Sequence, residues 1–193
     1  MSASHKDKST RPGRVVVIMG PPNAGKDTQG ELLAAKLDAT YIGSGNLIRN
    51  EADPRLMAII NRGELAPEED FRRLISHAIA QVPLEKTVIL VGIAKRPEEA
   101  KWLVEHLPTL GRWLDRVALI KISQEVGIER SLQRSHGRAD DHPELQAFRW
   151  SRFYDLTQQS LDYFHDLGLL TEVDGVGTLN EVEQRIERAI NDK

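Results

Sequence analysis

The chain has 193 residues, of which 40% are hydrophobic and 28% charged, and its net charge is -3. This length and composition predict one globular domain with its own core. The near-neutral charge gives no basic field for nucleic acid. The absence of cysteine excludes disulfides, thiol catalysis and cysteine-bound zinc. No apolar run approaches the ~20 residues that span a membrane. We expect a cytoplasmic protein that binds neither nucleic acid nor membranes.

The first half of the chain alternates strands and helices. Residues 1–13 are expected to form a flexible tail, and residues 14–193 a single domain. Residues 14–19 are an apolar, β-branched run, which is typical of a central parallel strand. Strands are also predicted over residues 40–42 and 87–91. Helices are predicted over residues 26–37, 45–51 and 68–81, with one more beginning at Pro54.

The second half continues the alternation, interrupted by a polar stretch over residues 134–142. Strands are predicted over residues 117–122 and 170–173. Helices are predicted over residues 124–133, 143–167 and 179–190, with one more beginning at Pro97. Strands that alternate with helices indicate a parallel sheet covered on both faces. The sequence therefore predicts an α/β protein with a five-stranded parallel sheet.

A glycine-rich loop follows the first strand. In Gly20-Pro-Pro-Asn-Ala-Gly-Lys-Asp-Thr28, Lys26 comes directly after the second glycine. Between a buried strand and a helix, such a loop turns successive backbone N–H groups toward an anion, and the helix N-terminus adds positive potential. The lysine reaches the outer phosphates of a nucleotide. The loop therefore predicts a site for the phosphates of a nucleoside triphosphate.

Six segments, in order along the chain, resemble the adenylate kinase family of nucleoside monophosphate kinases. The likeness extends from Val15 to about Ile190. The segments are residues 20–29, residues 41–49, residues 63–67, residues 92–95, the group of Arg130, Arg134 and residues 137–141, and Arg149. Several motifs in the family's order are far more specific than any one of them alone.

The resemblance implies a P-loop nucleoside triphosphate hydrolase-like fold of three layers, with an acceptor-binding segment over residues 43–72 and a short lid over residues 134–142. It implies reversible phosphoryl transfer from MgATP to AMP, giving two ADP, by a monomer. Mg2+ is expected to come with the ATP, and no zinc is expected. Phosphoryl transfer depends on positioning, on cations around the moving group and on exclusion of water. Closure of the short lid is expected to exclude that water.

The resemblance also implies which residues form each site. Those expected at the ATP site are Pro22, Asn23, Ala24, Gly25, Lys26, Asp27, Thr28, Arg130, Arg134 and Gly177. Those expected at the monophosphate site are Ser44, Arg49, Glu64, Leu65, Ala66, Gly92, Lys95, Glu99, Arg138 and Arg149. The cations expected to act on the transferred group are Lys26, Lys95, Arg134, Arg138 and Arg149. Thr28 is expected near the Mg2+ shell, with Asp140 and Asp141 helping through water or the donor ribose.

Several positions depart from the family's pattern. Asn23 and Asp27 replace loop glycines, and Asp27 places a carboxylate near an anion site. Val91 stands where the family has an aspartate that touches the water shell of Mg2+. Lys95 replaces an arginine, which keeps the charge but loses the two-pronged grip on phosphate. Glu99 replaces a glutamine that reads adenine. An ionised glutamate only accepts hydrogen bonds, so it suits a base edge with two donors, as in guanine.

These departures leave alternatives open. The acceptor is AMP or another monophosphate, namely GMP, UMP or CMP. The chain could instead be a nucleotide-binding sensor or partner protein with weak or no transfer activity. A P-loop hydrolase is the least favoured alternative, because the predicted lid arginines would have little purpose in one. If Glu99 reads the base, Glu99→Gln is expected to shift acceptor preference toward AMP.

Overall fold

The computed structural model describes residues 11–133 and 143–191, and expectations for the remaining residues lie outside it. Its five strands form one parallel sheet in the order β2-β3-β1-β4-β5. The strands are β1 (Arg14–Met19), β2 (Thr40–Gly43), β3 (Val88–Val91), β4 (Trp113–Lys121) and β5 (Leu170–Asp174). The predicted fold class is confirmed.

The helices follow the strands in alternation, as predicted. They are α1 (Lys26–Lys36), α2 (Ser44–Glu51), α3 (Pro54–Asn61), α4 (Glu68–Ala80), α5 (Pro97–His106), α6 (Gln124–Leu132), α7 (Pro143–Asp166) and α8 (Leu179–Asn191). A short 3-10 helix, η2 (Leu107–Leu110), extends α5 and was not predicted. The other bounds agree with the predictions to within one or two residues, apart from the start of β4.

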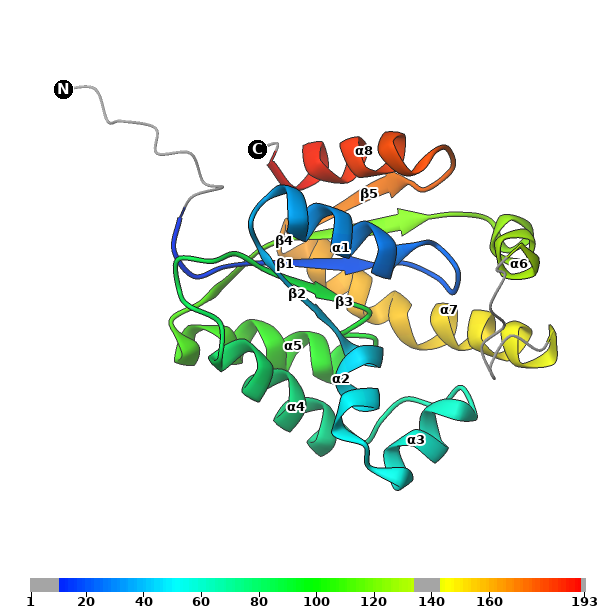
Figure 1. Ribbon diagram of the computed structural model, residues 1–193, viewed down its shortest axis with the longest axis horizontal. Coiled ribbons are helices and arrows are strands. Elements are labelled where there is room, and N and C mark those ends of the chain that lie inside the picture. The colour runs from blue at the N-terminus through cyan, green and yellow to red at the C-terminus, as the bar shows by residue number, and fades with distance from the viewer. Residues whose placement is uncertain (1–10, 134–142, 192–193) are drawn as a thin grey trace.

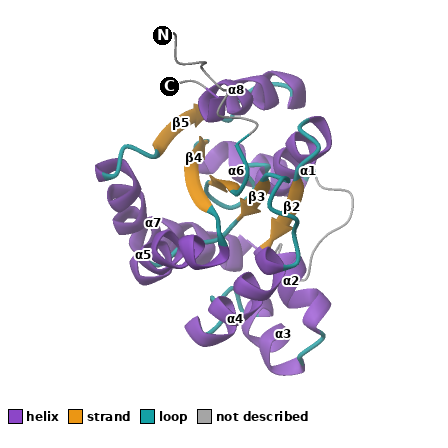
Figure 2. Ribbon diagram, turned by 90° about the vertical axis from the view of Figure 1, so that its left-hand side faces the viewer, coloured by secondary structure: helices purple, strands orange, loops and turns teal. Residues whose placement is uncertain are grey.

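The central strand β1 separates two hydrophobic cores. Val15, Val17 and Met19 pack against α4, α5 and α7, whereas Val16 and Ile18 pack against α1 and α8. Alternate residues of a strand point to opposite faces, so a continuous apolar run supplies both cores. Figures 1 and 2 show the result: α1 and α8 lie on one face of the sheet, and α4, α5 and α7 lie on the other.

Strand β4 begins at Trp113, four residues before the predicted start at residue 117. Its first part was not predicted because the polar residues Asp115 and Arg116 interrupt the apolar run in the sequence. Asp115 is buried, and its carboxylate accepts a hydrogen bond from Nε of Arg14 in β1 at 2.7 Å. Pairing with a neighbouring strand thus allows a carboxylate inside the sheet, where an apolar run was expected.

The parallel arrangement brings the carboxyl ends of β1 and β3 together. The backbone N–H of Gly92, just after β3, donates to the carbonyl of Ile18 at 3.2 Å. Loops that follow neighbouring parallel strands share one edge of the sheet, where ligands bind in open α/β folds. Helices α2 and α3 project from the main body beyond β2 (Figure 1). The glycine-rich loop and the segment after β3 therefore face the same space as α2 and α3.

Candidate functional site

The loop between β1 and α1 is folded tightly by residues with positive φ. These angles are +155° at Gly20, +62° at Asn23 and +84° at Gly25. A Cβ on Gly20 would lie 2.7 Å from the carbonyl oxygen of Ile120, so only glycine fits there. Gly25 is the N-cap of α1, which places the positive end of that helix directly after the loop. The loop has the shape and position that a phosphate site requires.

Two side chains hold this loop in place. Lys26, the first residue of α1, donates a hydrogen bond from Nζ to the carbonyl of Pro21 at 2.7 Å. The ammonium therefore curves back over the loop. The side-chain amide of Asn23 donates to the side-chain carbonyl of Gln146 on α7 at 3.0 Å. The phosphate loop is thus fastened to α7, the helix that carries Arg149.

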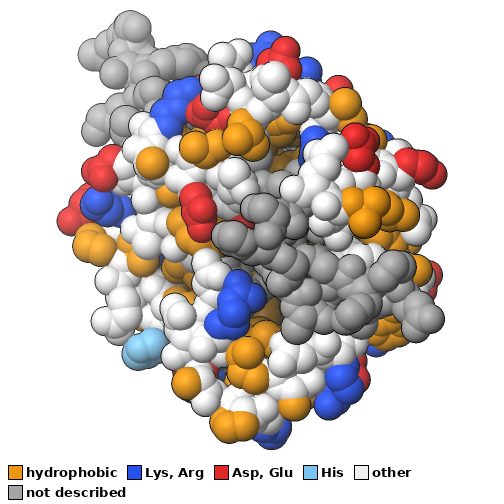
Figure 3. All heavy atoms as spheres, turned by 45° about the vertical axis from the view of Figure 1, so that its right-hand side comes forward, with side chains coloured by type: hydrophobic (Ala, Val, Ile, Leu, Met, Phe, Trp, Pro, Cys, Tyr) orange, Lys and Arg blue, Asp and Glu red, His pale blue; other side chains and the backbone are white. Residues whose placement is uncertain are grey.

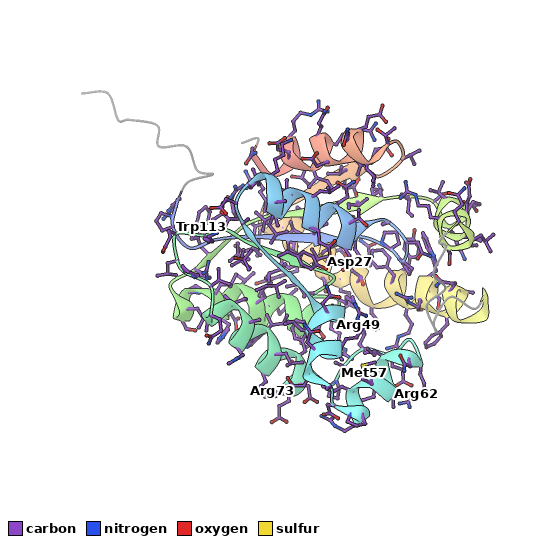
Figure 4. The ribbon with its side chains drawn as sticks, viewed as in Figure 1. Asp27, Arg49, Met57, Arg62, Arg73 and Trp113 are labelled. Carbon is purple, nitrogen blue, oxygen red and sulfur yellow. The ribbon has the colours of Figure 1, made fainter. Side chains whose placement is uncertain are left out.

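A cavity of about 530 Å3 opens between this loop, α2, α3 and α7. Its volume is within the range of small-molecule sites. The predicted monophosphate residues that line it are Ser44, Arg49, Glu64, Leu65, Ala66, Gly92, Lys95 and Arg149. The loop contributes Gly20, Pro22, Lys26 and Asp27 to the same cavity. Figure 4 shows how Asp27, Arg49 and Met57 reach it from α1, α2 and α3.

The segment after β3, residues 92–95, places the cation Lys95 at the cavity wall. Gly92 and Ala94 have φ of +67° and +54°, and a left-handed alanine is a strained residue of the kind found at functional sites. Lys95 follows them and lines the cavity. Burial lowers the pKa of its ammonium group; the nearby Glu99 carboxylate opposes this shift, and Arg149 adds to it. Lys95 is therefore a desolvated cation, which binds an anionic ligand strongly.

Five cations from four separate parts of the chain line the one cavity: Lys26, Arg49, Lys95, Arg149 and Arg152. Such convergence costs free energy in the unbound protein and is offset when a polyanion binds. Asp27 and Glu64 add two carboxylates to the same lining. On the molecular surface, charges of both signs are interspersed around this side of the molecule (Figure 3). In this view the described residues form no broad patch of positive charge.

The predicted donor-base residues lie beside the loop. The guanidinium of Arg130 on α6 donates to the carbonyl of Gly175 at 2.8 Å and to that of Ala24 at 3.4 Å. It thus joins the phosphate loop to the segment before α8, which contains Gly177 at φ +133°. Arg130 and Ala24 are thus in contact, and neither is among the described residues that line the cavity.

Several predicted site residues lie outside the described part of the chain. They are Arg134, Arg138, Asp140 and Asp141. Glu99 is described, and its carboxylate accepts from the backbone N–H groups of Lys95 and Arg96 at the start of α5. Among the described residues that line the cavity, Glu99 does not appear. The structure therefore places this side chain behind the cavity wall.

Arg152 is a cavity residue that the sequence analysis missed. It lies on α7 three residues after Arg149, so both point from the same helix face. Its guanidinium lies 5.4 Å from the centroid of the Phe148 ring, and its buried Nε has no hydrogen-bond partner among the described residues. The i, i+3 spacing of two arginines was the available signal. It was overlooked because the family motif includes only the first of them.

Metal-binding capacity at the site rests on few side chains. Within residues 11–133 and 143–191, no group of three or more His, Cys, Asp or Glu side chains is placed to hold a metal ion. The oxygen groups nearest the loop are the Asp27 carboxylate and the exposed Thr28 hydroxyl, both in the first turn of α1. Mg2+ is typically bound by one or two protein oxygens together with substrate phosphates, and this donor set fits that chemistry.

No helix within the described ranges is both long enough and apolar enough to cross a membrane. The longest, α7, spans 24 residues and alternates charged with apolar side chains. Its buried residues face the sheet and the phosphate loop. This helix therefore serves as one wall of the cavity.

A model of the family described as adenylate kinase matches residues 18–169. That range contains the phosphate loop, α2 and α3, the segment after β3, and α7. The chain belongs to the adenylate kinase family. The members of this family are phosphotransferases.

Individual relatives cover nearly the whole chain. The adenylate kinase of Xanthomonas euvesicatoria pv. vesicatoria is 31% identical over 183 residues, which is 91% of this chain and 98% of that protein. The adenylate kinase of Thermobifida fusca is 30% identical over 92% of this chain and 98% of its own length. The adenylate kinase of Thermus thermophilus is 31% identical over 92% and 97%. The likeness therefore includes the complete fold of the family.

Proposed function

We propose that the chain transfers the γ-phosphoryl group of MgATP to AMP, giving two ADP, and catalyses the reverse reaction. The observation that carries this proposal is the single cavity that joins the phosphate loop to Arg49, Lys95 and Arg149. A nucleotide-binding protein without transfer needs only the loop. Cations on the far wall, facing that loop, provide for a second phosphorylated ligand.

In the proposed reaction an oxygen of the acceptor phosphate attacks the γ-phosphorus. The bond between that phosphorus and the bridging oxygen breaks, and its electron pair leaves with ADP. The protein contributes positioning and neutralisation of charge. Lys26 contacts the donor side, Arg49 and Lys95 orient the acceptor phosphate, and Arg149 stabilises the equatorial oxygens of the group in transfer. Lys95 does this with one point charge, whereas Arg149 offers a planar fork.

Mg2+ would neutralise charge on the donor phosphates when it is bound with ATP. Of the described residues, Asp27 and Thr28 are those placed to support it through oxygen atoms. Val91 at the end of β3 provides no oxygen, and its side chain packs against Gly30. The carboxylate near the metal thus belongs to α1 in this proposal.

The proposal includes the division of the domain into moving parts. Residues 43–72, which contain α2 and α3, would bind the acceptor, and residues 134–142 would form the short lid. The predicted lid cations Arg134 and Arg138 would complete the ring around the transferred group, and Arg130 and Gly177 would contact the donor base. A monomer in the cytoplasm is the expected form, by analogy with the family.

The proposal is tested with ATP, Mg2+ and each of AMP, GMP, UMP and CMP, by following diphosphate formation. Wild-type protein should convert AMP. Lys26→Ala should reduce kcat by a factor on the order of 100 or more, because it removes a charge that follows the transferred group. Lys101→Ala, an exposed lysine on α5, serves as the matched control and should leave the rate unchanged.

Two outcomes would contradict this proposal in different ways. Turnover with GMP, UMP or CMP but not with AMP would support the kinase activity and contradict AMP as its acceptor. Tight ATP binding by calorimetry, with no diphosphate formed from any acceptor, would leave the nucleotide-binding sensor as the function. Transfer to water alone would indicate a hydrolase.

A further inference from the structure

The start of α5 holds a buried carboxylate, Glu99, that is paired with the partly exposed guanidinium of Arg96. Glu99 is only 3% exposed. Its Oε1 accepts from the Nη1 of Arg96 at 2.8 Å, and its Oε2 accepts from the backbone N–H groups of Lys95 at 3.0 Å and Arg96 at 3.4 Å. Three donors fix the direction of this carboxylate. The hydrogen-bonding capacity of Glu99 is therefore engaged within the protein.

The same guanidinium reaches the acceptor segment. Nη1 of Arg96 donates to the carbonyl of Ala66 at 2.9 Å, and Nη2 donates to that of Leu65 at 3.5 Å. Leu65 and Ala66 belong to the link between α3 and α4, and both line the cavity. Ala66 also packs against Leu56 and Leu74. Arg96 thus connects the first turn of α5 to the main chain that forms one wall of the acceptor site.

We infer that Arg96 is a positioning residue for the acceptor, that Glu99 holds it in place, and that Glu99 does not read the acceptor base. This inference rests on the proposed function and deepens it. Among the described residues, the cavity is lined by Leu65 and Ala66, and the two charged side chains lie behind them. Arg96 therefore acts through the backbone it supports.

This arrangement explains why Arg96 and Glu99 are both charged, whereas a single neutral side chain would be enough to recognise the base. For Glu99 to turn toward a base, it would have to leave the guanidinium and two backbone N–H groups without partners. Such a loss in a buried place is unfavourable. The base instead meets main-chain groups and the apolar side chains of Met57, Ile60 and Leu65. Base selection is therefore set by the shape and backbone of this wall.

The inference predicts that substitutions at Arg96 and Glu99 weaken acceptor binding without changing which base is preferred. Arg96→Ala should raise the KM for AMP by about tenfold, the equivalent of one lost charged hydrogen bond, while the KM for ATP changes less than about twofold. Arg96→Lys should recover part of the loss, because an ammonium still donates to one carbonyl. Glu99→Gln should raise the KM for every acceptor by a similar factor and leave the ratio of AMP to GMP turnover unchanged.

The experiment measures kcat and KM for ATP, AMP and GMP with these three variants and with Lys101→Ala as the control on the same helix. A change of more than about tenfold in the AMP to GMP ratio for Glu99→Gln would overturn the inference, since one lost base contact has that size. Equal effects of Arg96→Ala on both substrates would also overturn it, because they indicate a general structural role.

Two further measurements distinguish a failure of the inference from a variant that does not fold and from a failure of the proposed function. Thermal unfolding is recorded for each variant, and Arg96→Gln replaces Arg96→Ala if the latter does not fold. Binding of AMP and of GMP is measured by calorimetry without a donor. If the wild-type chain transfers phosphate to no acceptor, the proposed function fails. In that case the inference is judged from binding alone. It predicts that the ratio of AMP affinity to GMP affinity is the same in Glu99→Gln as in the wild type.

Discussion

The hydroxyl of Tyr41 donates a hydrogen bond to Oδ1 of Asp27 at 2.8 Å. The phenol comes from β2 and the carboxylate from the first turn of α1. Burial raises the pKa of Tyr41, and the charge of Asp27 raises it further, so the tyrosine remains a donor. Tyr41 therefore engages one oxygen of Asp27 in a hydrogen bond, which reduces the repulsion that a carboxylate without such a donor would cause at this position.

The first prediction concerns that repulsion. Asp27→Asn removes the negative charge and keeps an acceptor for the Tyr41 hydroxyl. We expect Mg2+-free ATP to bind several-fold more tightly, because a like charge a few ångströms from the phosphates contributes on the order of 1 kcal/mol near a surface. Calorimetry in the presence of EDTA measures this. Unchanged or weaker binding would show that Asp27 does not face the donor phosphates.

The second prediction concerns how Tyr41 is seated. A Cβ on Gly43 would lie 2.2 Å from the Tyr41 hydroxyl oxygen and 2.8 Å from its ring carbon. Gly43 has an ordinary φ of -102°, so the effect of an added methyl is purely steric. Gly43→Ala should lower the free energy of unfolding by about 1–3 kcal/mol, as overpacking does. Urea denaturation gives the value.

A double-mutant cycle isolates the contact between Tyr41 and Gly43. In a Tyr41→Ala background, Gly43→Ala should cost less than about 0.5 kcal/mol, because the clash has gone. An equal loss in both backgrounds would show that Gly43 is required by something other than the tyrosine ring.

The third prediction concerns pH. Burial lowers the pKa of Lys95 from its ordinary value of 10.5, so the folded protein releases this proton at a lower pH than the unfolded chain. In the proposed function, binding of the acceptor phosphate requires Lys95 in its charged form. We therefore expect kcat/KM for AMP to fall on the alkaline side below pH 10.5. Lys95→Arg should remove this alkaline fall, because a guanidinium stays charged.

The lowered pKa of Lys95 also affects the pH dependence of the free energy of unfolding. A cation whose pKa is lowered by folding destabilises the native state at neutral pH, and that cost disappears as pH rises through the folded pKa. The wild-type free energy of unfolding should therefore rise with pH in the alkaline range before general denaturation begins. A pH–rate profile of kcat/KM that is identical for wild type and Lys95→Arg would contradict the prediction.

The fourth prediction concerns the buried pair of Arg14 and Asp115, whose side chains are 2% and 5% exposed. Asp115→Asn leaves a buried guanidinium without its counter-charge and should lower the free energy of unfolding by about 3–5 kcal/mol. Replacing both residues with apolar side chains, Arg14→Met with Asp115→Leu, should recover most of the loss. Chemical denaturation of the wild type, Asp115→Asn and the double variant checks this. A loss of stability in the double variant as large as that of Asp115→Asn would reject it.

Much of the fold was predictable because apolar periodicity and the positions of glycine and proline carry it. The run from Arg14 to Met19 and the helix starts at Pro54 and Pro97 were predicted correctly for these reasons. The beginning of β4 was not. Its carboxylate at Asp115 is compensated by Arg14, about a hundred residues earlier, and no local pattern reveals a partner at that distance.

The site was predictable to the extent that it follows motifs. The residues near Lys26, Arg49 and Lys95 come together in one cavity because parallel strands place their following loops at one edge. The orientation of Glu99 was not predictable from its place in a motif. Its direction depends on Arg96, which the family pattern does not include, and on the free backbone N–H groups at the start of a helix.

The buried guanidinium of Arg14 also has a consequence for the order in which the chain folds. Its Nη2 donates to the carbonyl of Ile190 at 2.6 Å, so a residue of the first strand depends on the last turn of α8. During synthesis the central strand emerges from the ribosome long before that partner exists. Because this contact joins residues far apart in the sequence, we expect the burial of β1 to be completed late in folding.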